Sequence, residues 1–92
     1  MNLTLIEMVL LSKAIGLSKS ELAYAVTKSL NHVKEEERTL GVAIDSLLAR
    51  NLLSKDLSTY KYRISSLGTA QLKKDLDELE LAITSIRKGI WL

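Results

Sequence analysis

Three separate stretches of this sequence hold cationic and hydroxyl side chains, together with one valine, whose chemistry suits binding to another molecule. The three stretches hold Ser18, Lys19 and Ser20; Arg38, Thr39, Val42 and Ser46; and Lys55, Lys61 and Arg63. Ammonium and guanidinium groups pair with phosphates, and the start of a helix binds anions through its hydroxyl and backbone N–H groups. Arginine also binds guanine through two hydrogen bonds, while threonine and valine methyl groups contact the thymine methyl. The chemistry that this set predicts is nucleic-acid binding.

Residues for catalysis or for a bound metal are scarce. The chain has no cysteine and one histidine, and its four glycines are scattered at positions 16, 41, 68 and 89, so none forms a phosphate-cradling loop. Thiolate metal sites and disulfides are excluded, and no acidic residue accompanies a candidate base in a motif. We therefore predict a protein that is not an enzyme, with no metal, no cofactor and no evident small-molecule ligand.

The net charge is small but unevenly distributed. The 92 residues carry a formal charge of +2, which is modest for a nucleic-acid-binding protein. Residues 51–65 hold three basic residues against the single acidic Asp56, a local charge of +2. Residues 34–50 hold three basic residues against four acidic ones, a local charge of −1, and the acidic run Glu35–Glu37 lies among them. The cationic surface is therefore expected mainly in residues 51–65.

Length and hydropathy predict one small domain in the cytoplasm. A chain of 92 residues is the size of a single domain. The apolar run from Leu3 to Leu11 is interrupted by Thr4 and Glu7, lacks a basic leader and is too short to span a bilayer. We expect a soluble, cytoplasmic protein with no membrane partner.

Two helices are predicted in the first 30 residues. Over residues 2–15 apolar side chains occupy nearly every helical face, which favours burial on more than one side. Gly16 is suited to end this helix, since glycine adopts the left-handed conformation at little steric cost. The second helix covers residues 19–30, and Ser18 with Glu21 three residues later forms a capping box at its start.

A third helix and a hairpin follow. The helix is predicted over residues 35–50, with the acidic run at its start. Its buried stripe consists of Leu40, Ile44, Leu47 and Leu48. The alternation of apolar and polar residues over 53–57 and 60–64 then predicts two strands, joined by a turn at Ser58 and Thr59. Tyr60 and Tyr62 are expected in the core of this hairpin.

The final helix, over residues 66–88, has the most regular pattern in the chain. Apolar residues spaced 4-3-4-3-4 form a heptad seam at Leu72, Leu76, Leu79, Ile83, Ile86 and Ile90. Charged residues cover the outside of the helix at Lys73, Lys74, Asp75, Asp77, Glu78 and Glu80. A heptad seam is typical of a coiled coil, so we predict that this helix forms a homodimer. The seam permits both parallel and antiparallel pairing.

Two phrases of the sequence resemble a known family. From Ile44 to Leu53 the third helix ends in a leucine-rich phrase, and from Tyr60 to Gly68 the hairpin ends in Tyr-Arg-Ile-Ser. With Leu72 after them, these phrases resemble the winged helix-turn-helix regulators of the MarR and PadR types. The chain is also similar in layout to small archaeal winged-helix proteins that have a coiled-coil helix. Asn51 and Ser66 stand where the family usually has glycine and proline.

The resemblance implies a mainly α fold with a small β-hairpin wing. Residues 1–65 would form a winged-helix DNA-binding domain, and residues 66–92 a long C-terminal dimerisation helix within the same compact unit. The implied function is that of a dimeric, sequence-specific, double-stranded DNA-binding protein that regulates transcription. The third helix would enter the major groove, the wing would contact the backbone or minor groove, and the start of the second helix would bind phosphates.

Two other functions remain open. The same fold can serve as a protein–protein interaction module without strong DNA binding, and the acidic run Glu35–Glu37 favours this alternative because acidic groups repel phosphates. A ligand-sensing regulator with a pocket between the DNA-binding and dimer regions is the third possibility. A steep loss of DNA affinity with salt separates the first function from the second, since phosphate contacts release counterions.

Overall fold

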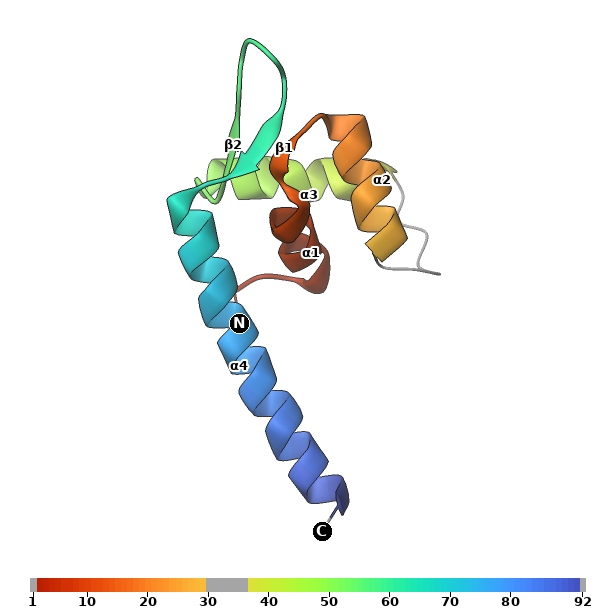
Figure 1. The fold of residues 1–92 in the computed structure, drawn as a ribbon, viewed down its shortest axis with the longest axis vertical. Helices are drawn as coiled ribbons and strands as arrows, with labels where there is room; N and C mark the ends of the chain where they lie inside the picture. Colours follow the sequence, from red (N-terminus) through yellow and green to blue (C-terminus); the bar gives the residue numbers. More distant parts are fainter. Residues whose placement is uncertain (1, 30–36, 92) are drawn as a thin grey trace.

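The computed structural model describes residues 2–29 and 37–91, and it is mainly helical with a small antiparallel sheet of three strands (Figure 1). The elements follow in the order α1, β1, α2, α3, β2, β3 and α4. Helices α1, α2 and α3 form a cluster beside the sheet, and α4 extends away from this cluster as a long arm. The expected mainly α fold with a hairpin is confirmed.

Helix α1 (Leu5–Lys13) is shorter at both ends than the predicted 2–15. The side chain of Thr4 accepts a hydrogen bond from the Glu7 N–H, at 3.1 Å, and Glu7 Oε1 accepts one from the Thr4 N–H, at 2.9 Å. This capping box sets the start of the helix, and its Thr-x-x-Glu spacing was readable from the sequence. Leu10 and Leu11 are fully buried in the core.

Strand β1 (Ile15–Leu17) occupies the place predicted for the end of the first helix, so that prediction was wrong. Ala14 ends the helix instead of Gly16, and its carbonyl accepts a hydrogen bond from the Ile64 N–H at 2.8 Å. Gly16 lies within the strand with a φ of +90°, where a side chain would be strained. The strand formed because its backbone groups found partners on β3, a long-range pairing that local periodicity does not reveal.

Helix α2 (Lys19–Ser29) begins at the predicted capping box. The Glu21 N–H donates to Ser18 Oγ at 3.3 Å, and the Ser18 N–H donates to Glu21 Oε1 at 3.2 Å. Its buried residues Leu22 and Val26 pack in the same core as α1 and α3. The predicted end of this helix at residue 30 lies outside the described residues.

Helix α3 (Glu37–Ala49) buries Leu40, Ile44 and Leu47, as predicted from their spacing. The helix ends where Asn51 adopts a φ of +59° and the Leu52 N–H donates to the Leu47 carbonyl at 3.0 Å. This is a Schellman motif in which asparagine replaces the usual glycine. The predicted start at residue 35, with Glu35 and Glu36, lies outside the described residues.

Strands β2 (Leu53–Lys55) and β3 (Tyr62–Ile64) form the predicted hairpin, with β3 in the centre of the sheet and β1 on its other side. Lys55 pairs with Tyr62 and Ser54 pairs with Arg63 across the hairpin. Tyr62 is buried, as expected. The expectation for Tyr60 was wrong: it has a φ of +57° in the turn, and its exposed fraction is 65%.

Helix α4 (Ser66–Trp91) is capped by Ser65, whose Oγ accepts a hydrogen bond from the Gly68 N–H at 2.9 Å. The first half of α4 packs on the body, so two predicted seam residues, Leu72 and Leu79, are partly buried against the chain's own core. Asp75 was expected on the outside of the helix, and that prediction was wrong, since only 1% of this residue is exposed. The carboxylate of Asp75 faces the body and not the solvent because backbone N–H groups near the N-terminus bind it.

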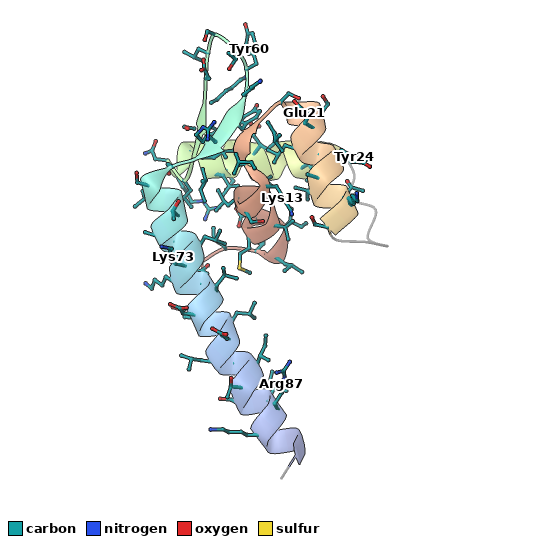
Figure 2. All side chains as sticks on the ribbon, viewed as in Figure 1. Lys13, Glu21, Tyr24, Tyr60, Lys73 and Arg87 are labelled. Atoms are coloured by element: carbon teal, nitrogen blue, oxygen red, sulfur yellow. The ribbon has the colours of Figure 1, made fainter. Side chains whose placement is uncertain are left out.

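The second half of α4 carries apolar side chains that no other described element covers. Ile83 and Ile86 of the predicted seam are exposed in this half, as is Leu81 outside the seam, and Leu76 of the seam is exposed in the first half. Figure 2 shows the side chains of this half, including Arg87, projecting from the arm without a neighbouring element. The side chain of Ile90 lies outside the described part of the chain. In the described residues, no helix has both the length and the apolar character needed to cross a membrane.

Candidate nucleic-acid interface

Three cations of the hairpin divide between the two faces of the sheet. Residues that pair across a hairpin share a face, so Lys55 lies on the side of Tyr62, while Arg63 lies on the opposite side with Ser54. Lys61 and Arg63 line the outer face together with Gly16, and a Cβ atom at Gly16 would lie 2.7 Å from Arg63 Nη2. Lys55 nevertheless lines the same outer hollow as Lys61 and Arg63, so the predicted cations of residues 51–65 lie together around it.

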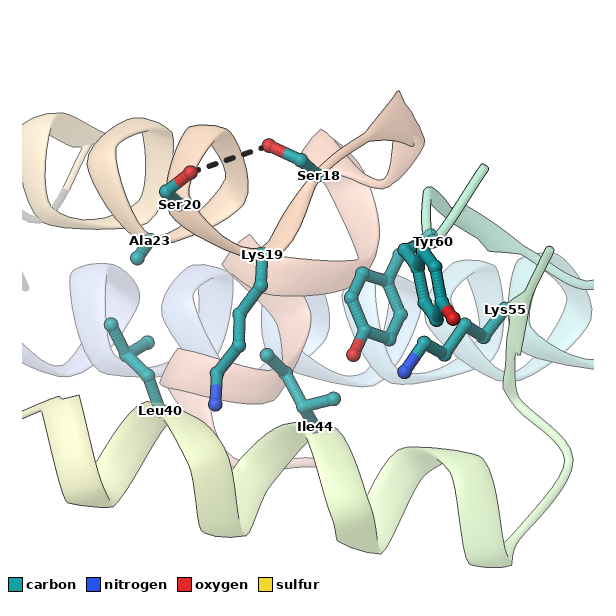
Figure 3. A pocket seen from close by; sticks show the side chains of 9 residues that line it. Ser18, Lys19, Ser20, Ala23, Leu40, Ile44, Lys55 and Tyr60 are labelled. Carbon is teal, nitrogen blue, oxygen red and sulfur yellow. Dashed lines mark hydrogen bonds between the residues drawn. The ribbon is translucent and has the colours of Figure 1, made fainter. Parts of the chain in front are cut away.

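A hollow of about 400 Å³ lies between the start of α2, helix α3 and the hairpin (Figure 3). Its wall contains the predicted residues Ser18, Lys19, Ser20 and Lys55. The rest of its wall is formed by Ala23, Leu40, Ile44, Tyr60 and Tyr62. The structure thus brings together two stretches of predicted site residues that are 35 positions apart in the sequence, from Ser20 to Lys55.

Two cations line this hollow, and one of them is held in place by its surroundings. The Lys55 ammonium lies 5.2 Å from the ring centroid of Tyr60 and 5.6 Å from that of Tyr62, which is cation–π distance. The Lys19 side chain extends from the start of α2 into the space between α2 and α3 (Figure 3). The positive end of the α2 dipole adds to both charges, so the hollow is suited to an anionic group.

Two acidic residues beside the interface stay ionised. Hydrogen bonds from the side chain and backbone of Ser18 lower the pKa of Glu21, and the nearby charge of Lys61 lowers it further. Hydrogen bonds from the hydroxyl and N–H of Ser58, and from the N–H of Thr59, lower the pKa of Asp56. These anions offset part of the positive charge around the hairpin.

The outer face of α3 carries fewer of the predicted residues. Val42 is exposed, while Ser46 is half-buried in a separate groove that also contains Ile6, Glu7 and Arg50. The side chains of Arg38 and Thr39 lie outside the described part of the chain. Asp45 is exposed on α3 three residues after Val42, and the sequence analysis did not select it. The helical period could have identified Asp45 from the sequence, because residues three apart in a helix, such as Val42 and Asp45, share a face.

An ion pair that the sequence analysis missed joins α1 to α3. The guanidinium of Arg50 binds the buried carboxylate of Glu7 and also donates to the Asn2 carbonyl at 3.4 Å. Glu7 caps α1 as well, so one carboxylate fixes both the start of α1 and the C-terminal end of α3. The pair positions α3 relative to the body.

No protein-family model, curated protein or solved structure matched this chain.

Proposed function

We propose that this protein is a dimeric, sequence-specific, double-stranded DNA-binding protein of the winged helix-turn-helix type, and that it regulates transcription. The observation that carries the proposal is the hollow in which the start of α2 and Lys55 of the hairpin lie beside Leu40 and Ile44 of α3. The element order of helix, strand, two helices, hairpin and helix also supports it. The dimer is proposed from the uncovered apolar residues of α4.

In this proposal each element makes one kind of contact. Ser18, Lys19 and Ser20 bind phosphates, because the start of α2 offers hydroxyls, an ammonium and free backbone N–H groups. Helix α3 enters the major groove, where Val42 contacts a thymine methyl and Asp45 accepts a hydrogen bond from cytosine N4. Arg38, Thr39 and Ser46 remain proposed contacts of the same helix. The wing brings Lys55, Lys61 and Arg63 to the backbone or minor groove.

The first experiment is a titration of a random-sequence duplex with the protein, followed by fluorescence anisotropy at two salt concentrations. We expect micromolar or tighter binding that weakens roughly 10⁴-fold between about 50 and 200 mM salt, as about eight phosphate contacts in a dimer would produce. Absence of binding at the lower salt concentration would contradict the proposal.

The double variant Lys61→Ala, Arg63→Ala is expected to bind all duplex sequences about tenfold or more weakly and to show a shallower salt dependence. Both side chains are exposed on the outer face of the hairpin, so their loss removes phosphate contacts without disturbing the core. The matched control is Lys73→Ala, Lys74→Ala, which removes two exposed cations from α4. If the hairpin variant keeps both its affinity and its salt slope, the wing has no part in binding.

The proposed dimer uses the second half of α4, with a second copy as its partner. Charges on the helix favour antiparallel pairing that crosses near Ile83. That arrangement sets the basic residues Arg87 and Lys88 of each helix beside the acidic stretch around Asp77 and Glu80 of the other. Parallel pairing in register would instead place the like charges together.

Sedimentation of the wild-type protein at tens of micromolar is expected to show a dimer, and the variant Ile83→Glu a monomer. At an antiparallel crossing the two introduced carboxylates face each other in an apolar seam, which weakens the dimer by roughly 100-fold or more. Leu81→Glu is the matched control, since Leu81 is exposed on the same helix but outside the seam. A monomeric wild-type protein would eliminate the dimer.

One observation favours the protein–protein interaction module as a second candidate. The groove between α1 and α3 has a mainly apolar wall that includes Ile6, Val42 and Ala43, and the neighbouring Asp45 is exposed. A mainly apolar groove beside an acidic residue suits a peptide better than a phosphate backbone. Failure of duplex binding at low salt would move the assignment to this candidate.

A further inference from the structure

The turn at the tip of the hairpin exposes a large apolar side chain. Leu57 has an exposed fraction of 81%, the highest among the exposed large hydrophobic residues of the described chain. A leucine at such a position gains nothing from folding, because its apolar surface stays in water. Single exposed leucines are common on protein surfaces, so the surroundings of Leu57 decide whether it has a role.

The turn that carries Leu57 is well ordered by hydrogen bonds. Asp56 Oδ1 accepts hydrogen bonds from the Ser58 N–H at 2.8 Å, the Ser58 hydroxyl at 2.7 Å and the Thr59 N–H at 3.3 Å. The Tyr60 N–H donates to the Asp56 carbonyl at 2.8 Å, and the Asp56 N–H donates to the Lys61 carbonyl at 2.9 Å. Leu57 is therefore held on a fixed turn, and little conformational entropy is lost when it inserts into a partner.

Cations flank the apolar tip on both arms of the hairpin. Lys55 comes from the arm before the turn, and Lys61 and Arg63 come from the arm after it. A narrow apolar tip between cations is complementary to the DNA minor groove, whose floor is formed by base edges and whose two walls carry phosphates. Minor-groove proteins use the same combination, with an apolar side chain between base steps and cations on the backbone.

We propose that Leu57 is a minor-groove wedge, which enters between two base pairs and bends the bound duplex. This inference rests on the proposed DNA binding and adds a source of sequence preference to it. Pyrimidine–purine steps such as TA unstack most easily, so the wedge favours sites with such a step beneath the tip. The preference arises from deformation of the duplex and needs no hydrogen bond to a base.

An anionic membrane is the other surface to which an apolar tip with flanking cations can bind. The apolar part here is one leucine with the neighbouring Tyr60 ring, which is 65% exposed, whereas even one myristoyl chain gives only marginal membrane binding. The start of α2 also lies beside the hairpin and makes the surface hollow (Figure 3). A hollow surface fits a rod such as duplex DNA better than a flat bilayer.

The test measures bending by energy transfer between dyes at the two ends of a duplex of about 25 base pairs with a TA step in each half, one for each hairpin tip of the dimer. We expect the wild-type protein to increase the transfer on binding. Leu57→Ser should abolish the increase and weaken binding about tenfold, yet keep the salt slope, because no phosphate contact is lost. Leu57→Met, which retains an apolar side chain, should restore most of the bending.

Leu81→Ser is the matched control, since Leu81 is also highly exposed but lies on α4. Wild-type binding with a steep salt slope but no bending would overturn the wedge alone. Bending by Leu57→Ser equal to that of the wild type would overturn it as well. Failure of the wild type to bind any duplex would instead defeat the proposed function. Sedimentation with phosphatidylserine vesicles that depends on Leu57 would assign the tip to membranes.

Discussion

Gly68→Ala is expected to destabilise the protein by about 3 kcal/mol or more, and chemical denaturation followed by circular dichroism measures the effect. Helix propensity alone predicts the opposite sign, because alanine favours a helix over glycine by about 1 kcal/mol. The tertiary surroundings decide the result. A Cβ atom at Gly68 would overlap the backbone carbonyl oxygen of Leu52 and lie 2.9 Å from its carbonyl carbon.

The clash at Gly68 is not easily relieved. The Leu52 carbonyl accepts a hydrogen bond from the Ser65 N–H at 3.1 Å, so moving it away disturbs the junction between β3 and α4. Ile64 Cγ1 would lie 3.0 Å from the new atom on another side. The Leu52 backbone and the Ile64 side chain therefore leave no room for a Cβ atom at Gly68.

Gly41→Ala is the matched control within α3. Nothing lies within 4 Å of a Cβ atom at Gly41, so this substitution should stabilise the protein by about 0.5–1 kcal/mol. If Gly68→Ala and Gly41→Ala are equally stable, Gly68 does not approach the Leu52 carbonyl closely enough to exclude a Cβ atom.

Asp75→Ala is expected to lower the Tm by roughly 10 °C or more. The carboxylate accepts hydrogen bonds from the Leu3 N–H at 2.7 Å, the Asn2 N–H at 2.9 Å and Gln71 Nε2 at 2.7 Å. Removal of the carboxylate leaves buried backbone donors without their acceptor, which costs more than an ordinary surface substitution. It also releases the contact that fixes the direction of α4 against the body.

Asp75→Asn keeps the volume of the side chain and tests the charge separately. The side-chain NH₂ group of the introduced asparagine is a donor, but Asn2, Leu3 and Gln71 all need an acceptor at this position. We therefore expect most of the Tm loss to remain. Asp77→Asn is the control, since Asp77 is exposed on the same helix and should change the Tm by little. A wild-type Tm in both Asp75 variants would contradict the role of this carboxylate.

The contribution of Asp75 also has a defined pH dependence. Burial acts to raise the pKa of Asp75, but hydrogen bonds from Leu3, Gln71 and Asn2 outweigh it, and the net pKa is below the usual value. A lowered folded-state pKa gives stability that is complete above the unfolded value of about 4 and is lost as the pH falls below it. The difference between the melting curves of the wild type and Asp75→Asn should therefore begin to shrink below about pH 4 and vanish only below the lower folded-state pKa of Asp75.

Local patterns in the sequence determined most of the helices and the hairpin. The spacing of Leu40, Ile44 and Leu47 identified the buried face of α3, and Ser18 with Glu21 identified the start of α2. The alternation around Tyr62 identified the hairpin. These signals suffice because capping, helical periodicity and strand alternation are decided by residues close together in the chain.

Only the tertiary structure decided the features that depend on distant partners. Strand β1 exists because β3 supplies its hydrogen-bond partners, and Asp75 is buried because Asn2 and Leu3 reach it across 73 and 72 positions. The hollow that joins Ser18–Ser20 to Lys55 is likewise set by packing. For the strand and for Asp75 the physical reason is that a buried polar group must find a partner, and the fold, not the neighbouring sequence, determines which partner is near.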